Sequence, residues 1–128
     1  GKIKSGDSIG IITYGRGVYW SLEAAENFDG AVEIIDLRTL YPIDENAMYD
    51  CAMRHGKILL VTEESVESSF TLGLAARIQK NCFEYLDAPV EVLGSIDTPA
   101  IPLNSTLEEA LLPNAKKVSQ AIKQLLTY

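Results

Sequence analysis

The chain has 128 residues, 47% of them hydrophobic, and its 18 acidic and 11 basic side chains give a formal net charge of −7. This length is typical of one domain with its own core, and so acidic a chain repels nucleic acid, which we exclude as a partner. No apolar run reaches the roughly 18–20 residues of a membrane helix, so we expect no membrane partner.

Short β-branched runs recur along the chain and predict strands. Their nearly continuous apolar character is typical of strands that are buried on both faces. The sequence also favours a short edge strand at Lys2–Lys4, ahead of the turn at Gly6. The buried strands are predicted at Ser8–Tyr14, Ala31–Asp36, Lys57–Glu63 and Pro89–Leu93.

Helical patterns lie between these strands. Val18, Leu22 and Ala25 recur at the i, i+4, i+7 spacing of one helix face. Asp44 is a favourable N-cap for a second helix, and Gly56 is a favourable stop. Further helices are predicted over 70–86, from Asn104 or Ser105, and from Asn114 with Val118, Ala121, Ile122 and Leu125 facing inward.

Alternating strands and helices predict an α/β fold, with a mostly parallel sheet covered by helices on both faces. In such sheets binding groups gather beyond the carboxyl ends of the strands. Polar residues are concentrated at those ends here, and we call this edge the rim. The rim residues are Tyr14, Gly15, Arg16, Asp36, Arg38, Glu63, Glu64 and Asp97.

The turn at Gly15–Gly17 follows a strand and opens a helix, and Asp36 lies 21 residues beyond Gly15. This resembles part of a dinucleotide fingerprint, in which the third glycine permits close helix–strand packing. Trp20 occupies the third position, and an indole cannot replace a missing side chain there. We therefore favour a simple tight turn and keep a nucleotide- or anion-binding module as the alternative.

The remaining reactive side chains do not predict an active site. Glu63 and Glu64 are adjacent on a strand and should point to opposite faces, so we expect one of them to pair with Arg16 or Arg38. His55 should lie at the amino-terminal edge of the next strand, away from the rim. Cys51 and Cys82 are 31 residues apart and predict buried, reduced thiols. We predict no catalytic, cofactor-binding or metal-ligating residue in this chain.

Several blocks resemble the transketolase C-terminal domain, in the version found in the beta subunit of the decarboxylating component of 2-oxo acid dehydrogenase complexes. The most specific block runs from Asp36 to Leu40 and is followed by Pro42-Ile43-Asp44. The resemblance continues through Val61-Thr62-Glu63-Glu64 and covers essentially the whole chain. Asn81-Cys82-Phe83 and Asp97-Thr98-Pro99 favour the branched-chain type, with the pyruvate and acetoin dehydrogenase types as alternatives.

This resemblance implies a three-layer α/β/α sandwich with five strands in the order 1-3-2-4-5, the short first strand being antiparallel. It implies that thiamine diphosphate and Mg²⁺ belong to the intact enzyme and lie outside this domain. Its partners would be the remaining domains, the alpha region, a second beta region and the acyltransferase core. The stretch 84–109 holds six acidic residues and no Lys or Arg, and Glu108 and Glu109 are candidate docking residues for the basic acyltransferase segment.

Because the chain opens with Gly1 and not with methionine, we expect residues 1–128 to be a single domain from a longer chain. The equivalent domain of transketolase or deoxyxylulose-phosphate synthase remains a related alternative. Reduced cysteines are typical of a cytoplasmic protein. From the resemblance to the beta-subunit domain, we expect this domain to support assembly of the enzyme and to be inactive by itself.

Overall fold

The computed structural model describes residues 2–37, 44–66, 69–95 and 112–128. The chain alternates between strands and helices, as the sequence predicts. Its strands are β1 (Lys2–Lys4), β2 (Ile9–Thr13), β3 (Val32–Asp36), β4 (Ile58–Ser65) and β5 (Glu91–Ser95). Its helices are α1 (Arg16–Ala25), α2 (Glu45–His55), α3 (Phe70–Cys82), the 3₁₀ turn η1 (Phe83–Tyr85) and α5 (Ala115–Leu126).

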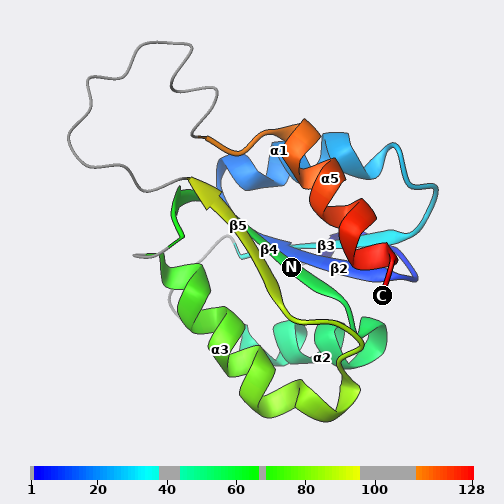
Figure 1. Cartoon of the computed structure of the whole chain (residues 1–128), viewed down its shortest axis with the longest axis vertical. Helices are drawn as coiled ribbons and strands as arrows, with labels where there is room; N and C mark the ends of the chain where they lie inside the picture. The colour runs from blue at the N-terminus through cyan, green and yellow to red at the C-terminus, as the bar shows by residue number, and fades with distance from the viewer. Residues whose placement is uncertain (1, 38–43, 67–68, 96–111) are drawn as a thin grey trace.

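The five strands form one sheet in the order β1-β3-β2-β4-β5. Strand β1 is antiparallel to β3, and the other neighbouring pairs are parallel. Helices α1 and α5 cover one face of the sheet, and α2 and α3 cover the other (Figure 1). The three layers, the strand order and the antiparallel first strand confirm the expected fold.

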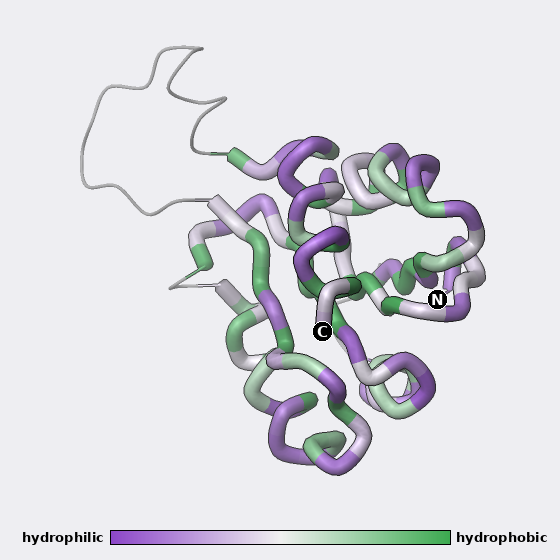
Figure 2. Tube along the Cα trace, turned by 45° about the vertical axis from the view of Figure 1, so that its right-hand side comes forward, coloured by the Kyte–Doolittle hydropathy of each residue, from purple (hydrophilic) through white to green (hydrophobic). Residues whose placement is uncertain are grey.

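The sheet divides the core into two halves, because successive strand residues point to opposite faces. Ile12 and Leu60 belong to the half that packs on α2 and α3. Ile11 and Leu59 belong to the half that packs on α1 and α5. Hydrophobic residues accordingly run through the central strands, whereas the helices alternate between hydrophilic and hydrophobic residues (Figure 2).

The helix ends follow from local chemistry. The Asp44 carboxylate accepts a hydrogen bond from the Ala47 N–H at 3.0 Å, and the Asn114 side chain accepts one from the Lys117 N–H at 2.8 Å. Both contacts satisfy amides that a helix N-terminus leaves unpaired. Helix α2 ends at Gly56 as predicted. The third helix is shorter than expected, since its last turn tightens into η1.

Candidate functional site

The rim is formed where β2, β3 and β4 end on one edge of the sheet. The three strands are parallel, so their carboxyl ends meet at the same side. The structure thereby brings six predicted rim residues to one edge, namely Tyr14, Gly15, Arg16, Asp36, Glu63 and Glu64. The other predicted residues, Arg38, Asp97, Glu108 and Glu109, and the helix expected from Asn104 or Ser105, lie outside the described residues.

The two glutamates at the end of β4 point to opposite faces, as predicted. Glu64 Oε1 lies 3.2 Å from the Tyr14 hydroxyl on the α3 side. Glu63 lines a hollow on the α1 side. Within the described residues Arg16 makes no ion pair, and its guanidinium lies 5.2 Å from the Trp20 ring centroid. A cation over an indole face is stabilised by the ring quadrupole. The other expected partner, Arg38, lies outside the described residues, so the pairing of a glutamate with Arg16 or Arg38 stays a prediction.

Tyr14 connects the rim to the hydrophobic core. Its hydroxyl lies 2.9 Å from Thr62 Oγ1, and its ring meets the Phe70 ring edge-on at a centroid distance of 6.4 Å. Burial raises the pKa of Tyr14, the Thr62 hydrogen bond opposes this effect, and the Glu64 charge adds to it. The phenol therefore stays protonated at neutral pH and donates to Glu64, which fixes the position of that carboxylate at the rim.

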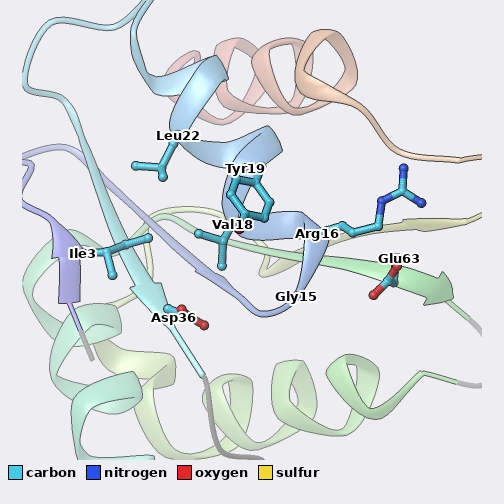
Figure 3. Close-up of a pocket in the computed structure, with 8 residues that line it drawn as sticks. All are labelled: Ile3, Gly15, Arg16, Val18, Tyr19, Leu22, Asp36 and Glu63. Atoms are coloured by element: carbon cyan, nitrogen blue, oxygen red, sulfur yellow. The ribbon is translucent and has the colours of Figure 1, made fainter.

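An open hollow of about 760 Å³ lies between β1, α1 and the rim. Figure 3 shows Asp36 close to Ile3 and below the apolar side chains of α1, with Glu63 apart from them beyond Arg16. Its lining consists of Ile3, Gly15, Arg16, Val18, Tyr19, Leu22, Asp36 and Glu63. Mixed apolar and charged walls around an open depression are typical of a surface that meets another polypeptide.

Helix α1 buries a different face from the one that its apolar spacing suggests. Val18 and Leu22, which share the helical spacing of the buried Ala25, are both partly exposed and line the hollow. The fully inward positions carry small side chains, at Gly17, Ser21, Ala24 and Ala25. Small residues let the helix lie close to the sheet, which leaves its larger apolar residues at the side.

The glycines of the Gly15–Gly17 turn allow α1 to pack closely on the sheet, and the turn does not have the features of a phosphate-binding loop. Gly15 has a φ of 59°, which favours glycine. A Cβ on Gly17 would overlap Thr13 Oγ1, so this glycine serves the contact between α1 and the sheet. The N–H groups of Gly17 and Val18 already donate to the Tyr14 and Gly15 carbonyls. With Asp36 and Glu63 nearby, the geometry disfavours a nucleotide phosphate.

The same observations disfavour direct binding of thiamine diphosphate by the described rim residues without a metal ion. A diphosphate needs free amide donors, cations or a metal held by carboxylates. The described rim offers one guanidinium, which stacks on Trp20, among three carboxylates.

A second polar cluster was missed by sequence reasoning and lies at the opposite edge. Glu33 is completely buried on β3, and both its oxygens accept hydrogen bonds from the Arg54 guanidinium at 2.7 and 3.0 Å. His55 Nε2 lies 2.6 Å from Oε1, and Lys2 Nζ lies 3.3 Å from Oε2. His55 is thus away from the rim, as predicted, and holds a buried carboxylate.

Atoms of Glu33, Cys51 and His55 lie within 4.8 Å of one another, which is compatible with a metal centre. In the absence of a metal ion, the charges of these groups are already balanced. Burial, followed by the nearby Glu33 charge, raises the pKa of the Cys51 thiol to about 12, so the sulfur is protonated at neutral pH. Glu33 is already neutralised by Arg54 and Lys2. Without a metal ion the cluster forms a buried ionic contact that ties β1 and α2 to β3, and the absence of a metal site stays a prediction.

Comparisons with known proteins all relate the chain to the same family. The family model described as "Transketolase, C-terminal domain" matches residues 2–118. The chain is 41% identical to the 2-oxoisovalerate dehydrogenase subunit beta of Bacillus subtilis, over 98% of the chain and 39% of that subunit. It is 32% identical to the pyruvate dehydrogenase E1 component subunit beta of Rhizobium meliloti, over 94% of the chain and 26% of that protein.

A solved structure titled "Split gene transketolase, inactive beta4 tetramer" has the same fold, with a TM-score of 0.77 and 25% identity. The match covers 97% of this chain and 41% of the other. Both comparisons show that the chain spans well under half the length of these relatives. In the part of the chain that the structure describes, no helix is long and apolar enough to cross a membrane.

Proposed function

Since the chain belongs to the transketolase C-terminal domain family, we propose that it is the C-terminal domain of the beta subunit of a branched-chain 2-oxo acid dehydrogenase. The observation that carries this proposal is the 41% identity to a 2-oxoisovalerate dehydrogenase beta subunit across 98% of the chain. Identity to a pyruvate dehydrogenase beta subunit is lower, at 32%. The parent enzyme would decarboxylate a 2-oxo acid oxidatively and transfer the acyl group to lipoyl groups.

In this proposal the domain contributes assembly and no reacting group. The rim would face the remaining domain of the beta subunit and the alpha region, where thiamine diphosphate and Mg²⁺ would be held. Hydrogen bonds between the strands that support the rim favour this role. Thr13 Oγ1 donates to the Val61 carbonyl at 2.8 Å beneath it, and the Ser95 hydroxyl donates to the Glu63 carbonyl at 2.6 Å. These bonds join β2, β4 and β5 at their carboxyl ends.

Self-association of the beta region is a further part of the proposal. The split-gene transketolase structure is titled a beta4 tetramer, so a beta chain of this fold can assemble with copies of itself. A second beta region would accordingly be a partner of this domain in the parent enzyme. We also propose a cytoplasmic location, which the two buried free cysteines favour.

The acyltransferase core would dock on the acidic stretch 84–109. Glu84, Asp87 and Glu91 are exposed, and Glu84 and Asp87 line a shallow hollow beside Phe83. Complementary charge speeds and orients protein association. Charge reversal at Glu108 and Glu109 in the full enzyme should weaken acyltransferase binding, most strongly at low salt. Unchanged affinity at low salt would remove this docking assignment.

The experiment that tests the proposed function compares the isolated domain with the parent beta subunit plus the alpha region. Each is supplied with thiamine diphosphate, Mg²⁺ and either 3-methyl-2-oxobutanoate or pyruvate. We expect decarboxylation only by the parent assembly, and faster with the branched substrate. Turnover by the isolated domain would contradict the assembly role, and a preference for pyruvate would contradict the substrate assignment.

A further inference from the structure

The hollow beside α1 has an apolar wall that the domain itself does not cover. Ile3 of β1 and Val18 and Leu22 of α1 are partly exposed there, and the Tyr19 side chain is 74% exposed. These four side chains face the same space from two elements (Figure 3). A large aromatic residue projecting beside aliphatic ones is typical of a contact surface, because such residues supply much of the binding energy at interfaces.

The direction of β1 places its first residue at the rim end of the hollow. Because β1 is antiparallel to β3, its first residue, Lys2, lies opposite Ile35, next to the last residue of β3. Lys2 therefore lies at the rim end of the sheet, close to Asp36. Asp36 and Ile3 both line the hollow. A segment joined to Lys2 is thus held at the mouth of the hollow by a covalent bond.

Its covalent attachment to Lys2 favours this segment over a separate polypeptide as the occupant of the hollow. A short flexible connection gives an effective concentration of the order of millimolar, which a free subunit does not reach. Ile3 of β1 and Tyr19 of α1 line the same hollow, so a short extended segment joined to β1, at about 3.3 Å per residue, would reach Tyr19. An extended strand also presents alternate side chains to one face, which suits the row of apolar residues in the hollow.

We propose that the hollow formed by Ile3, Val18, Tyr19 and Leu22 is the seat of the polypeptide that immediately precedes residue 1 in the parent beta subunit. The seated segment is extended and places an aliphatic or aromatic side chain against Tyr19. Its docking fixes the orientation of this domain relative to the preceding one. This inference rests on the proposed function, because it requires the chain to follow another domain in one polypeptide.

The first test is hydroxyl-radical footprinting of the unmodified parent beta subunit, with tyrosine oxidation read by mass spectrometry. In the domain alone, Tyr19 is more exposed than Tyr85 at 52% or Tyr128 at 58%, so it would be oxidised at least as fast as they are. In the parent subunit we expect Tyr19 to be oxidised at least fivefold more slowly than Tyr85. The protection should persist without the alpha region and should not change on dilution, since the contact is intramolecular.

The second test identifies the occupant by photo-cross-linking from p-benzoylphenylalanine incorporated at position 19, with position 85 as the matched control. We expect position 19 to cross-link to the peptide just upstream of residue 1 in the same chain, as mixed isotope labelling would show. Protection that needs the alpha region, a cross-link to another chain, or a Tyr19 that is oxidised as fast as Tyr85 would each overturn the proposal. Decarboxylation by the assembled parent enzyme reports separately on the proposed function.

Discussion

The Glu33 carboxylate is buried, and the side chains around it determine its charge. Burial raises the pKa of Glu33, but hydrogen bonds from Arg54, His55 and Lys2 outweigh burial and lower the pKa from 4.5 to about 2. The folded state therefore holds the ionised form more strongly than the unfolded state does. This contribution to stability is fully present above about pH 4.5 and is lost as the pH falls towards 2.

We predict that Glu33→Gln lowers the free energy of unfolding at pH 7 by on the order of 3 kcal/mol, because the buried charge partner of Arg54 is removed. The gap to the unsubstituted chain should close between pH 4.5 and 2, where Glu33 itself becomes protonated. Urea unfolding at several pH values measures both effects. Asp50→Asn is the control, since Asp50 is 61% exposed in its pair with Arg54 and should cost about 0.5 kcal/mol or less. A gap that stays constant with pH would contradict the linkage.

Metal addition provides a separate test of the same cluster. Cys51 is protonated at neutral pH because burial, and then the Glu33 charge, raises its pKa to about 12, and a thiolate is the form that binds zinc. We expect Zn²⁺ at tenfold molar excess to leave the melting temperature at pH 7 unchanged. A rise that Glu33→Gln abolishes would instead identify Glu33, Cys51 and His55 as a metal centre.

Two helical glycines form a matched pair for testing how closely α1 lies on the sheet. A Cβ on Gly17 would overlap Thr13 Oγ1 and approach the Val61 carbonyl to 3.2 Å, whereas a Cβ on Gly73 meets nothing within 4 Å. We predict that Gly17→Ala destabilises the domain by about 1–3 kcal/mol. Gly73→Ala should stabilise it by roughly 0.5–1 kcal/mol. Equal effects in urea unfolding would show that the α1 contact can relax.

At the scale of elements, the α2 cap can be tested directly. Asp44 is the residue whose side chain accepts from the Ala47 N–H. Replacing it with alanine leaves that amide without its partner and should cost roughly 1 kcal/mol. Asp44→Asn keeps an acceptor oxygen and should cost much less. Thermal unfolding of the two variants distinguishes loss of the cap from loss of the charge.

The elements were predictable to within a few residues because their signals are local. A β-branched run, an N-cap and a terminal glycine act on neighbouring backbone groups, so the sequence contains the whole signal for α2 from Asp44 to Gly56. The faces of α1 were not predictable in the same way. Which side of that helix is buried depends on how closely it approaches Thr13 and Val61, and those contacts join distant parts of the chain.

The two candidate sites also differ in whether local sequence signals could predict them. Parallel strands place their carboxyl ends together, so the rim could be anticipated from the strand pattern. The Glu33 cluster could not, because Glu33 sits within an apolar strand and its partners come from β1 and α2. A single charged residue inside a buried strand was the one available signal, since such a charge must be paired.

At the scale of the whole molecule, the sheet separates two cores, and both cysteines lie in the same one. Cys51 on α2 and Cys82 at the end of α3 are 0% and 1% exposed and belong to the cluster between those helices and the sheet. Burial raises the pKa of both thiols. Reaction with a thiol reagent therefore requires this layer to open and the thiol to ionise.

We predict that both cysteines are modified at the same slow rate in native buffer, and that this rate rises with urea in step with global unfolding. The reason is that α2 and α3 pack on each other as well as on the sheet, with Cys82 Sγ lying 3.9 Å from the Tyr49 carbonyl oxygen. Mass spectrometry of each cysteine-containing peptide separates the two rates. If Cys82 reacts well before Cys51 at low urea, α3 must detach before the rest of the core, and the α2–α3 layer does not open as one unit.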